Sequence, residues 1–323
     1  MSGLRIVHVS PTPLVGAPGK IAWAQSQKGH RSICVVLADY PKGGPLEGKF
    51  LDKSLKLDPF TRGYIEEEIR GADIVHVHNF LADATSDWLL KLNQSATYVY
   101  QAHSPLREGP LYVNRVPDPP EAINFALKLI VGQYAGRMFP DFIPVPNIID
   151  ASPSVKPRRR QDKLRVMFSP SHSRGGRWNA KYSARCEEVQ SALQKLDRIE
   201  LVRPDAPVSP TVLMELRRGC HLSIDEIVTG AFHQISLEAL CAGNVAVNRA
   251  DYFSKATYST FCQGEQPPFH YADEGCIGDV LLGLAENWEE TARLQQASFD
   301  FFQKYCAPQK LVEVFDEAYH RIQ

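Results

Sequence analysis

A loop near the start of the chain has the composition of an anion-binding turn. The segment Ser10–Lys20 combines glycines and prolines between an expected strand and an expected helix. Backbone amides in such a loop can approach a ligand closely, and the positive end of the helix dipole favours negative charge. The spacing Gly16-x-x-Gly19 matches neither GxGxxG nor GxxxxGK[ST], so it does not indicate a dinucleotide site or a P-loop. Gly16 and Gly19 are candidates for phosphate binding, and a simple strand-to-helix connection is an equally weighted alternative.

Histidines occupy and follow the next expected strands. His76 and His78 alternate along one strand, so both rings should point to the same face. His103 directly follows another strand, at the end where parallel sheets bind their ligands. A metal site would need a third and a fourth ligand, and no spacing supplies them, so we expect no metal here. His103 is the candidate ligand-facing residue, whereas His76 and His78 have a structural or substrate-lining role.

Basic residues concentrate in one stretch of an otherwise balanced chain. Residues 156–181 contain nine Lys and Arg but a single acid, Asp162. Residues 158–160 are expected to belong to a solvated linker. The later part follows an expected strand and precedes an expected helix, where Arg and Lys can hold phosphate oxygens by charge-assisted hydrogen bonds. The candidates for a diphosphate site are Ser171, Arg174, Arg177 and Lys181.

A fourth segment runs from Asp225 to Val247 and joins a strand, a polar glycine-bearing loop and a helix that begins near Gln234. Glu238 lies early on that helix, and a carboxylate at this position can accept hydrogen bonds from both hydroxyls of a ribose. A single glutamate on a helix is more often a solvated surface residue, but the neighbours of Glu238 favour a ligand role.

Alternating strands and helices must position these residues. Short apolar runs rich in β-branched residues predict buried parallel strands, and strand–helix–strand units within about 35 residues build parallel sheets. The strands expected are 4–9, 33–37, 72–78, 98–103, 142–145, 164–168, 199–202, 220–224 and 245–248. Residues 121–138 are expected to form a helix, and 309–321 a terminal helix. The polar, proline-bearing stretch 150–161 predicts a linker between α/β domains at 1–150 and 151–323.

Composition excludes several classes of protein. A chain of 323 residues is long enough for two domains of about 150 residues. Its 36 basic and 37 acidic residues give a net charge of −1, which argues against a nucleic-acid-coating protein. The seven scattered cysteines include no CxxC pair, so neither a disulfide framework nor a zinc module is indicated. Without a signal-peptide pattern or an apolar run of roughly 20 residues, we expect a soluble, cytoplasmic protein with at most peripheral membrane contact.

The segment around Glu238 also carries a family resemblance. It resembles the motif E-G-F-G-x-x-x-x-E-A-x-A-x-G-x-P-V of the retaining, GT-B-fold glycosyltransferases of the group 1, glycogen-synthase-like superfamily. The match runs from Gly230 to Val245, with these residues in register: Phe232, Glu238, Ala239, Ala242 and Gly243. Further resemblances occur in order along the first half, at 6–11, 72–78 and 145–150.

The resemblance implies a fold and an activity. The fold would be α/β of the GT-B type, with two Rossmann-like domains, a cleft between them and a C-terminal helix that returns to the first domain. The activity would be transfer of a sugar from a UDP-, GDP- or ADP-sugar to a saccharide or small-molecule acceptor, with retention at the anomeric carbon and without a metal or other cofactor. In this superfamily the leaving diphosphate can itself help to deprotonate the attacking hydroxyl.

The same resemblance assigns roles to the candidates. His103 would contact the donor sugar or the acceptor, Arg174 and Lys181 would stabilise the leaving diphosphate, and Glu238 would hold the ribose. The remaining donor-binding residues would be Gly16, Gly19, Ser171, Arg177, Phe232 and His233.

Two departures from the family pattern leave alternatives open. The first motif glutamate falls on Gly230, which has no side chain, and the expected second-domain arginine falls near Ser171. Asp225, Glu226 or His233 could supply the missing polar contact. A non-catalytic sugar-nucleotide- or glycan-binding protein, and a nucleotide-sugar 2-epimerase, are therefore alternatives to a transferase.

Overall fold

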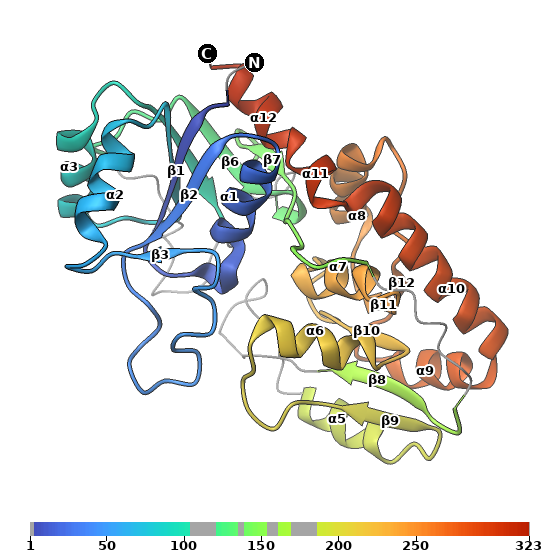
Figure 1. Cartoon of the computed structure of the whole chain (residues 1–323). Coiled ribbons are helices and arrows are strands. Elements are labelled where there is room, and N and C mark those ends of the chain that lie inside the picture. Colours follow the sequence, from blue (N-terminus) through green and yellow to red (C-terminus); the bar gives the residue numbers. More distant parts are fainter. Residues whose placement is uncertain (1–2, 104–120, 135–138, 154–160, 169–185, 323) are drawn as a thin grey trace. The chain divides into compact units, whose positions relative to one another are not determined.

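The computed structural model describes residues 3–103, 121–134, 139–153, 161–168 and 186–322. Ser171, Arg174, Arg177 and Lys181, the candidates from the basic stretch, lie outside these residues. The described chain divides into two compact units. The first comprises the chain up to Asp150 together with the segment from Pro308 onward, and the second extends from Ala151 to Ala307 (Figure 1).

The first unit is built on a seven-stranded, entirely parallel sheet. Its strands are β1 (Arg5–Ser10), β2 (Arg31–Val36), β3 (Leu55–Lys56), β4 (Ile74–His78), β5 (Thr97–Ala102), β6 (Leu127–Val131) and β7 (Ile143–Val145). They are ordered β3-β2-β1-β4-β5-β6-β7. The chain therefore reverses its direction of travel across the sheet between β1 and β4, and such a reversal is where open parallel sheets bind ligands.

Helices cover both faces of this sheet. They are η1 (Leu14–Gly16), α1 (Ala17–Gln27), α2 (Arg62–Arg70), α3 (Asp83–Leu92), α11 (Pro308–Leu311) and α12 (Glu313–His320). Figure 1 shows α2 and α3 on one side of the sheet and α1 with α12 on the other. Every residue of β4 is buried, as a central strand covered on both faces requires. The C-terminal helix thus completes the first unit, as the resemblance implies.

The second unit contains a five-stranded parallel sheet. Its strands are β8 (Leu164–Phe168), β9 (Ile199–Val202), β10 (Leu222–Ile224), β11 (Val245–Asn248) and β12 (His270–Tyr271), in the order β12-β11-β10-β8-β9. Its helical segments are α5 (Cys186–Gln194), α6 (Pro210–Arg218), α7 (Gln234–Cys241), α8 (Tyr252–Ser259), η3 (Thr260–Cys262), α9 (Ile277–Glu286), α10 (Trp288–Phe301) and the π-helical η4 (Phe302–Cys306). Here the reversal lies between β8 and β10.

Local signals explain where the helices of the second unit begin. The Ser209 hydroxyl accepts a hydrogen bond from the Val212 amide at the start of α6, and Pro210 occupies the first turn. Asn287 caps α10 in the same way through the Glu290 amide. The apolar faces of α5, α9 and α10 pack on β8, β10 and β11 in one core, which includes Leu164, Phe168, Leu222, Val245 and Leu281.

Most expected elements are confirmed, and one is wrong. Strands β8, β9 and β11 have the bounds that the apolar runs predict, and the α/β class is confirmed. The expectation of a helix over 121–138 is wrong, because Leu127–Val131 is β6, an interior strand between β5 and β7. A short apolar run does not distinguish a buried strand from a buried helix segment.

Two further findings concern the cysteines and the possibility of a membrane-spanning helix. The six cysteines whose side chains the structure describes are all free thiols. No helix in the described ranges is both long and apolar enough to cross a membrane.

Candidate functional site

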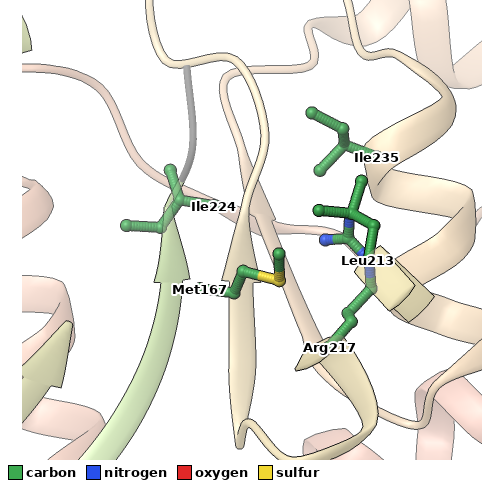
Figure 2. A pocket seen from close by; sticks show the side chains of 5 residues that line it. All are labelled: Met167, Leu213, Arg217, Ile224 and Ile235. Carbon is green, nitrogen blue, oxygen red and sulfur yellow. The ribbon is translucent and has the colours of Figure 1, made fainter. Parts of the chain in front are cut away.

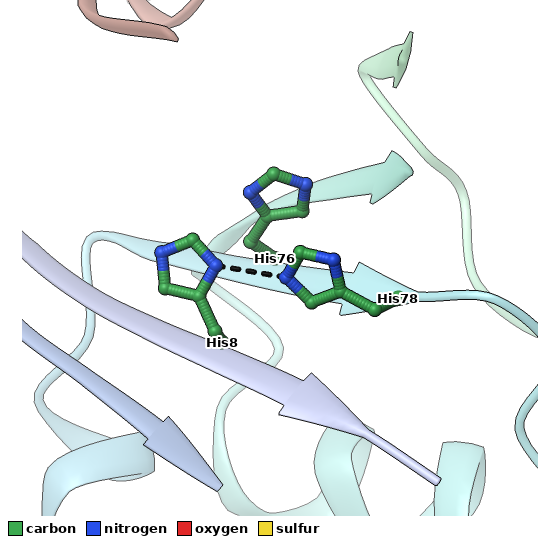
Figure 3. A group of neighbouring side chains, drawn as sticks. All are labelled: His8, His76 and His78. Atoms are coloured by element: carbon green, nitrogen blue, oxygen red, sulfur yellow. Dashed lines mark hydrogen bonds between the residues drawn. The ribbon is translucent and has the colours of Figure 1, made fainter. Parts of the chain in front are cut away.

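Histidines from neighbouring strands meet where the first sheet reverses. His8 of β1 is paired in register with His76 of β4, and His78 follows two residues later on the same face. All three rings are fully buried. One nitrogen of each ring lies within 4.8 Å of one nitrogen of the other two, and Figure 3 shows the three side chains together. His76 and His78 are recognisable from their alternation in the sequence, whereas His8 is not, because nothing in a sequence states which strand lies next to β4.

The ring orientations suit hydrogen bonds better than a shared metal ion. The rings of His76 and His78 are stacked, with centroids 4.3 Å apart and planes inclined by only 19°. A metal lies close to the plane of each imidazole that binds it, about 2.0–2.1 Å from the nitrogen. Two nearly parallel planes share no such point, so a metal would require one ring to rotate. Metal independence stays a prediction.

His103 lies just beyond the carboxyl end of β5 and joins this cluster. Its Nε2 atom is 2.7 Å from Nδ1 of His78. The backbone amide of His103 donates to the side-chain oxygen of Asn79 at 2.8 Å, and Asn79 itself has a left-handed backbone with φ of 56°. Asparagine tolerates this conformation better than most residues, so its position after β4 is suited to holding His103. Burial lowers the pKa of His103 to about 3, so its ring is neutral at physiological pH.

The glycine loop is closely packed. A Cβ atom on Gly19 would lie 2.7 Å from Oγ of Ser54 and 2.9 Å from the carbonyl oxygen of Lys53, so only glycine fits without a shift. The amide of Gly16 donates to the carbonyl oxygen of Pro13 at 2.8 Å, which occupies that donor. Val15, a β-branched residue, has a φ of 56°, an uncommon conformation that is costly for such a side chain. The phosphate-binding role of Gly16 and Gly19 stays a prediction.

Two lysines beside this loop were not singled out from the sequence. Lys20 is buried, and its Nζ atom lies 3.4 Å from Oδ1 of Asp150. Lys53 lies 2.7 Å from Oδ2 of the same carboxylate. Burial opposes ionisation of Asp150, but the two lysines outweigh it and lower the pKa of that carboxyl. Lys20 directly follows the Gly16-x-x-Gly19 pattern, and this position could have identified it from the sequence.

In the second unit, Asp225 organises the start of α7. Its carboxylate accepts hydrogen bonds from the His233 amide at 2.6 Å and from the Ser236 hydroxyl at 2.7 Å. Burial alone would raise its pKa, but His233 and Ser236 lower the pKa of Asp225 to about 2. The His233 ring lies with Nδ1 3.3 Å from the other Asp225 oxygen. Asp225 and His233 therefore support each other, and a donor contact for His233 stays a prediction.

Glu226 and Gly230 shape the loop before α7. Glu226 accepts hydrogen bonds from the amides of Val228 and Thr229, and burial raises the pKa of its carboxyl. Gly230 has a φ of 91°, a conformation that disfavours any side chain. A Cβ atom there would lie 3.0 Å from Oδ2 of Asp251, which explains why this backbone does not accommodate a glutamate at position 230.

Glu238 is held from two sides. Arg217 of α6 donates to Oε2 at 3.0 Å, and the Gln234 side chain donates to Oε1 at 2.8 Å. The Arg217 side chain is only 2% exposed and that of Glu238 11%, so this ion pair is almost entirely removed from water. Each carboxylate oxygen keeps a second lone pair that could accept from a ligand hydroxyl. Arg217 was missed in the sequence analysis, since a helix arginine 21 residues before Glu238 carries no pattern.

A small cavity of about 40 Å³ adjoins this ion pair. Figure 2 shows its lining, which joins the ends of two strands to α6 and α7. The lining residues are Met167, Leu213, Arg217, Ile224 and Ile235. The cavity therefore lies where the second sheet reverses between β8 and β10.

Phe232 has a packing role. Its side chain is fully buried and contacts the rings of Tyr258 and Phe269, with centroids 5.3 and 4.9 Å away. This burial leaves no part of the Phe232 side chain open to a ligand in the described conformation, so donor contact through this ring has no support.

Comparison with known proteins places the fold. No protein-family model and no curated protein sequence matches the chain. Among solved structures, sucrose-phosphate synthase from Thermosynechococcus elongatus is similar with a TM-score of 0.59 and 10% identity, over 98% of each chain. A glycosyltransferase from Rickettsia africae gives 0.59 and 12%, over 100% of this chain and 99% of its own. The catalytic domain of starch synthase IV from Arabidopsis thaliana, bound to ADP and acarbose, gives 0.57 and 12%, over 99% of each.

At such identities the similarity concerns the fold. It spans nearly the whole chain in all three comparisons. Together with the two parallel α/β units and a C-terminal helix that completes the first of them, it identifies the chain as a protein of the GT-B glycosyltransferase fold.

Proposed function

We propose that the chain is a retaining glycosyltransferase that moves a sugar from a nucleoside diphosphate sugar to an acceptor hydroxyl. The observation that carries the proposal is the buried Glu238, fixed by Arg217 and Gln234 beside a cavity at the reversal point of a parallel sheet. A carboxylate oriented in this way suits the two hydroxyls of a ribose. The solved structures with the same fold include an enzyme bound to ADP, and another, TarM from S. aureus, in complex with UDP.

The transfer reaction depends mainly on electrostatic stabilisation of the leaving diphosphate. Negative charge develops on the diphosphate as the glycosidic bond breaks, and preorganised donors at such a position are worth about 2.7–4 kcal/mol each. We assign this task to Arg174, Arg177 and Lys181, and the diphosphate in turn assists deprotonation of the acceptor hydroxyl. His103, a neutral ring, would contact a hydroxyl of the donor sugar or the acceptor.

Asp251 is a candidate for the acid that position 230 lacks. Its Oδ2 atom lies 3.0 Å from the place that a Cβ atom at position 230 would take, while its Oδ1 atom accepts from the Ser254 amide at the start of α8. Asparagine caps helices as well as aspartate does, so Asp251→Asn should leave folding intact. We expect this variant to bind the nucleoside diphosphate normally and to lose turnover.

Calorimetric titration with UDP, GDP, ADP and their sugars tests the proposal. Wild type should bind one nucleotide, and Glu238→Gln should weaken that binding about tenfold, the loss expected for a hydrogen bond of about 1.4 kcal/mol. Glutamine keeps the shape of the side chain and an oxygen that can still accept from Arg217, whereas alanine removes the partner altogether. Both substitutions remove the negative charge. Glu289→Gln, at an exposed position of α10, is the matched control and should bind as wild type does.

The outcomes separate the alternatives. If no nucleotide binds wild type at millimolar concentration, the proposal fails. Binding without turnover in any acceptor screen indicates the non-catalytic alternative. A product formed from the donor alone, in the absence of acceptor, indicates the epimerase; one solved structure similar to this chain is a putative UDP-N-acetylglucosamine 2-epimerase from Listeria monocytogenes, with a TM-score of 0.51.

A further inference from the structure

A continuous chain of hydrogen bonds runs from α1 through the sheet to His103. Oε1 of Gln25 is 2.7 Å from Nε2 of His8, Nδ1 of His8 is 2.8 Å from Nε2 of His78, and Nδ1 of His78 is 2.7 Å from Nε2 of His103. Figure 3 shows the central link between His8 and His78. His8 and His78 therefore each use both ring nitrogens in this chain, and His103 uses its Nε2.

The amide of Gln25 determines which nitrogen of each ring donates in this series of hydrogen bonds. An amide oxygen can only accept, so Nε2 of His8 carries a proton and its Nδ1 a lone pair. That lone pair requires a proton on Nε2 of His78, which leaves the lone pair of His78 on Nδ1. By the same step, Nε2 of His103 carries the proton and Nδ1 of His103 is an acceptor.

Both polar atoms of the Gln25 amide have hydrogen-bond partners in this orientation. Oε1 also accepts from the Ser32 hydroxyl at 2.8 Å, and Nε2 donates to the Tyr319 hydroxyl at 3.2 Å. The Tyr319 hydroxyl lies 2.8 Å from Nδ1 of His76, to which it can donate. The two hydroxyls can each donate or accept, so they satisfy the amide in this orientation, and the NMR measurement below decides between it and the turned amide.

This series of hydrogen bonds requires neutral imidazole rings, and burial keeps the rings neutral. An imidazolium has two donors and no acceptor, so one charged ring would break the sequence of bonds. Burial lowers the pKa of His8 to about 4 and holds the pKa of His78 well below its usual value.

We propose that Gln25, His8 and His78 are positioning residues that hold His103 in its Nε2–H tautomer, so that Nδ1 of His103 accepts a hydrogen bond from a ligand hydroxyl. No partner for Nδ1 of His103 exists among the residues that the structure describes. A sugar hydroxyl can donate to this lone pair, whereas an ionised phosphate oxygen cannot. The identity of the hydroxyl rests on the proposed function; the tautomer does not.

Long-range ¹H–¹⁵N NMR of the histidine rings tests the tautomer directly, with signals assigned through single-histidine variants. In wild type at pH 7 we expect His8, His78 and His103 to be protonated at Nε2 alone. A Gln25 amide turned by 180° would reverse every donor, so a proton on Nδ1 of His103 overturns the proposal.

Gln25→Met removes the acceptor at the start of the chain while keeping an unbranched side chain. We expect His103 to become a mixture of tautomers in the folded protein. Binding of the sugar nucleotide should weaken in proportion to the lost Nε2–H population, about twofold for an even mixture. Binding of the nucleoside diphosphate without its sugar should not change. Gln27→Met, at an exposed position of the same helix, is the matched control.

The results distinguish this proposal from the proposed function. A purely structural Gln25 would lower the stability of the variant but leave the His103 tautomer of the folded protein unchanged, and that result overturns the proposal. If wild type binds no sugar nucleotide while His103 is protonated at Nε2 in wild type and mixed in Gln25→Met, the proposed function fails and the control of the tautomer holds.

Discussion

The two units bury polar groups at the same topological position but use different chemistry there. Where the first sheet reverses, between β1 and β4, neutral imidazoles are joined by hydrogen bonds. Where the second sheet reverses, between β8 and β10, a charged pair of Arg217 and Glu238 lies beside a small cavity. In the neutral cluster, the tautomer of one ring determines the tautomer of the next, and protonation of any ring in acid would break the series of hydrogen bonds. The charged pair fixes a carboxylate, and it is sensitive to the loss of either partner.

The largest expected effect breaks the charged pair. Glu238→Ala leaves Arg217 buried without its counter-charge, and such a loss costs about 3–5 kcal/mol of unfolding free energy. Urea unfolding measures it. Replacing both members with apolar residues, as in Arg217→Met with Glu238→Leu, should recover most of the loss. A double variant as unstable as the single one would contradict this account of the pair.

The neutral cluster should make stability fall in acid. Burial depresses the folded-state pKa of His8 to about 4 and that of His103 to about 3, so the unfolded chain binds more protons below its own pKa of about 6.5. The stability that depends on neutral histidine rings is fully present above pH 6.5 and is lost as the pH falls toward 4. Each such histidine adds a slope of about 1.4 kcal/mol per pH unit.

Unfolding free energies measured from pH 7 to pH 4.5 check this slope. His8→Gln places a side chain that does not titrate at this position, so it should reduce the slope by the amount that one histidine contributes. His320→Gln at an exposed position should leave it unchanged. An unaltered slope in His8→Gln would show that His8 titrates alike in the folded and unfolded chains.

A smaller effect is expected from the hydroxyl that borders the neutral cluster. Tyr319→Phe removes the partner of both Gln25 and His76 and leaves buried polar atoms without hydrogen bonds, which costs about 1–3 kcal/mol. Thermal and urea unfolding measure the loss. Phe315→Leu on the same helix removes no hydrogen bond and should behave as an ordinary change of core packing.

The smallest effect concerns the loop that precedes Glu238. Gly230→Ala places a Cβ atom 3.0 Å from Asp251 at a φ of 91°, and we expect a loss of about 1–2 kcal/mol. Gly63→Ala is the control, because a Cβ atom there meets nothing within 4 Å and alanine favours the helix. Equal stability of the two variants would show that position 230 tolerates a side chain.

The sequence predicts elements better than it predicts neighbours. The alternation of His76 and His78 predicts a shared face, because the two-residue period of a strand is local. The approach of His8 depends on strand order, which forms only when residues about 70 positions apart pair. Glu238 was identified from a local motif, whereas Arg217 was not, since its partner comes from another helix. Residues 127–131 were assigned to a helix for a related reason: their burial on both sides of β6 is a tertiary property.

The contribution of Tyr319 has a consequence for synthesis of the chain. Domains generally fold as they leave the ribosome, the N-terminal one first. Here the first unit includes residues from Pro308 onward, and Tyr319 supplies hydrogen bonds to Gln25 and His76. The nascent first unit therefore lacks the hydrogen-bond partner of Gln25 and His76 until residues 308–320 have been synthesised, whereas the described residues of the second unit are all made before them. In this order of assembly, the half made first is finished last.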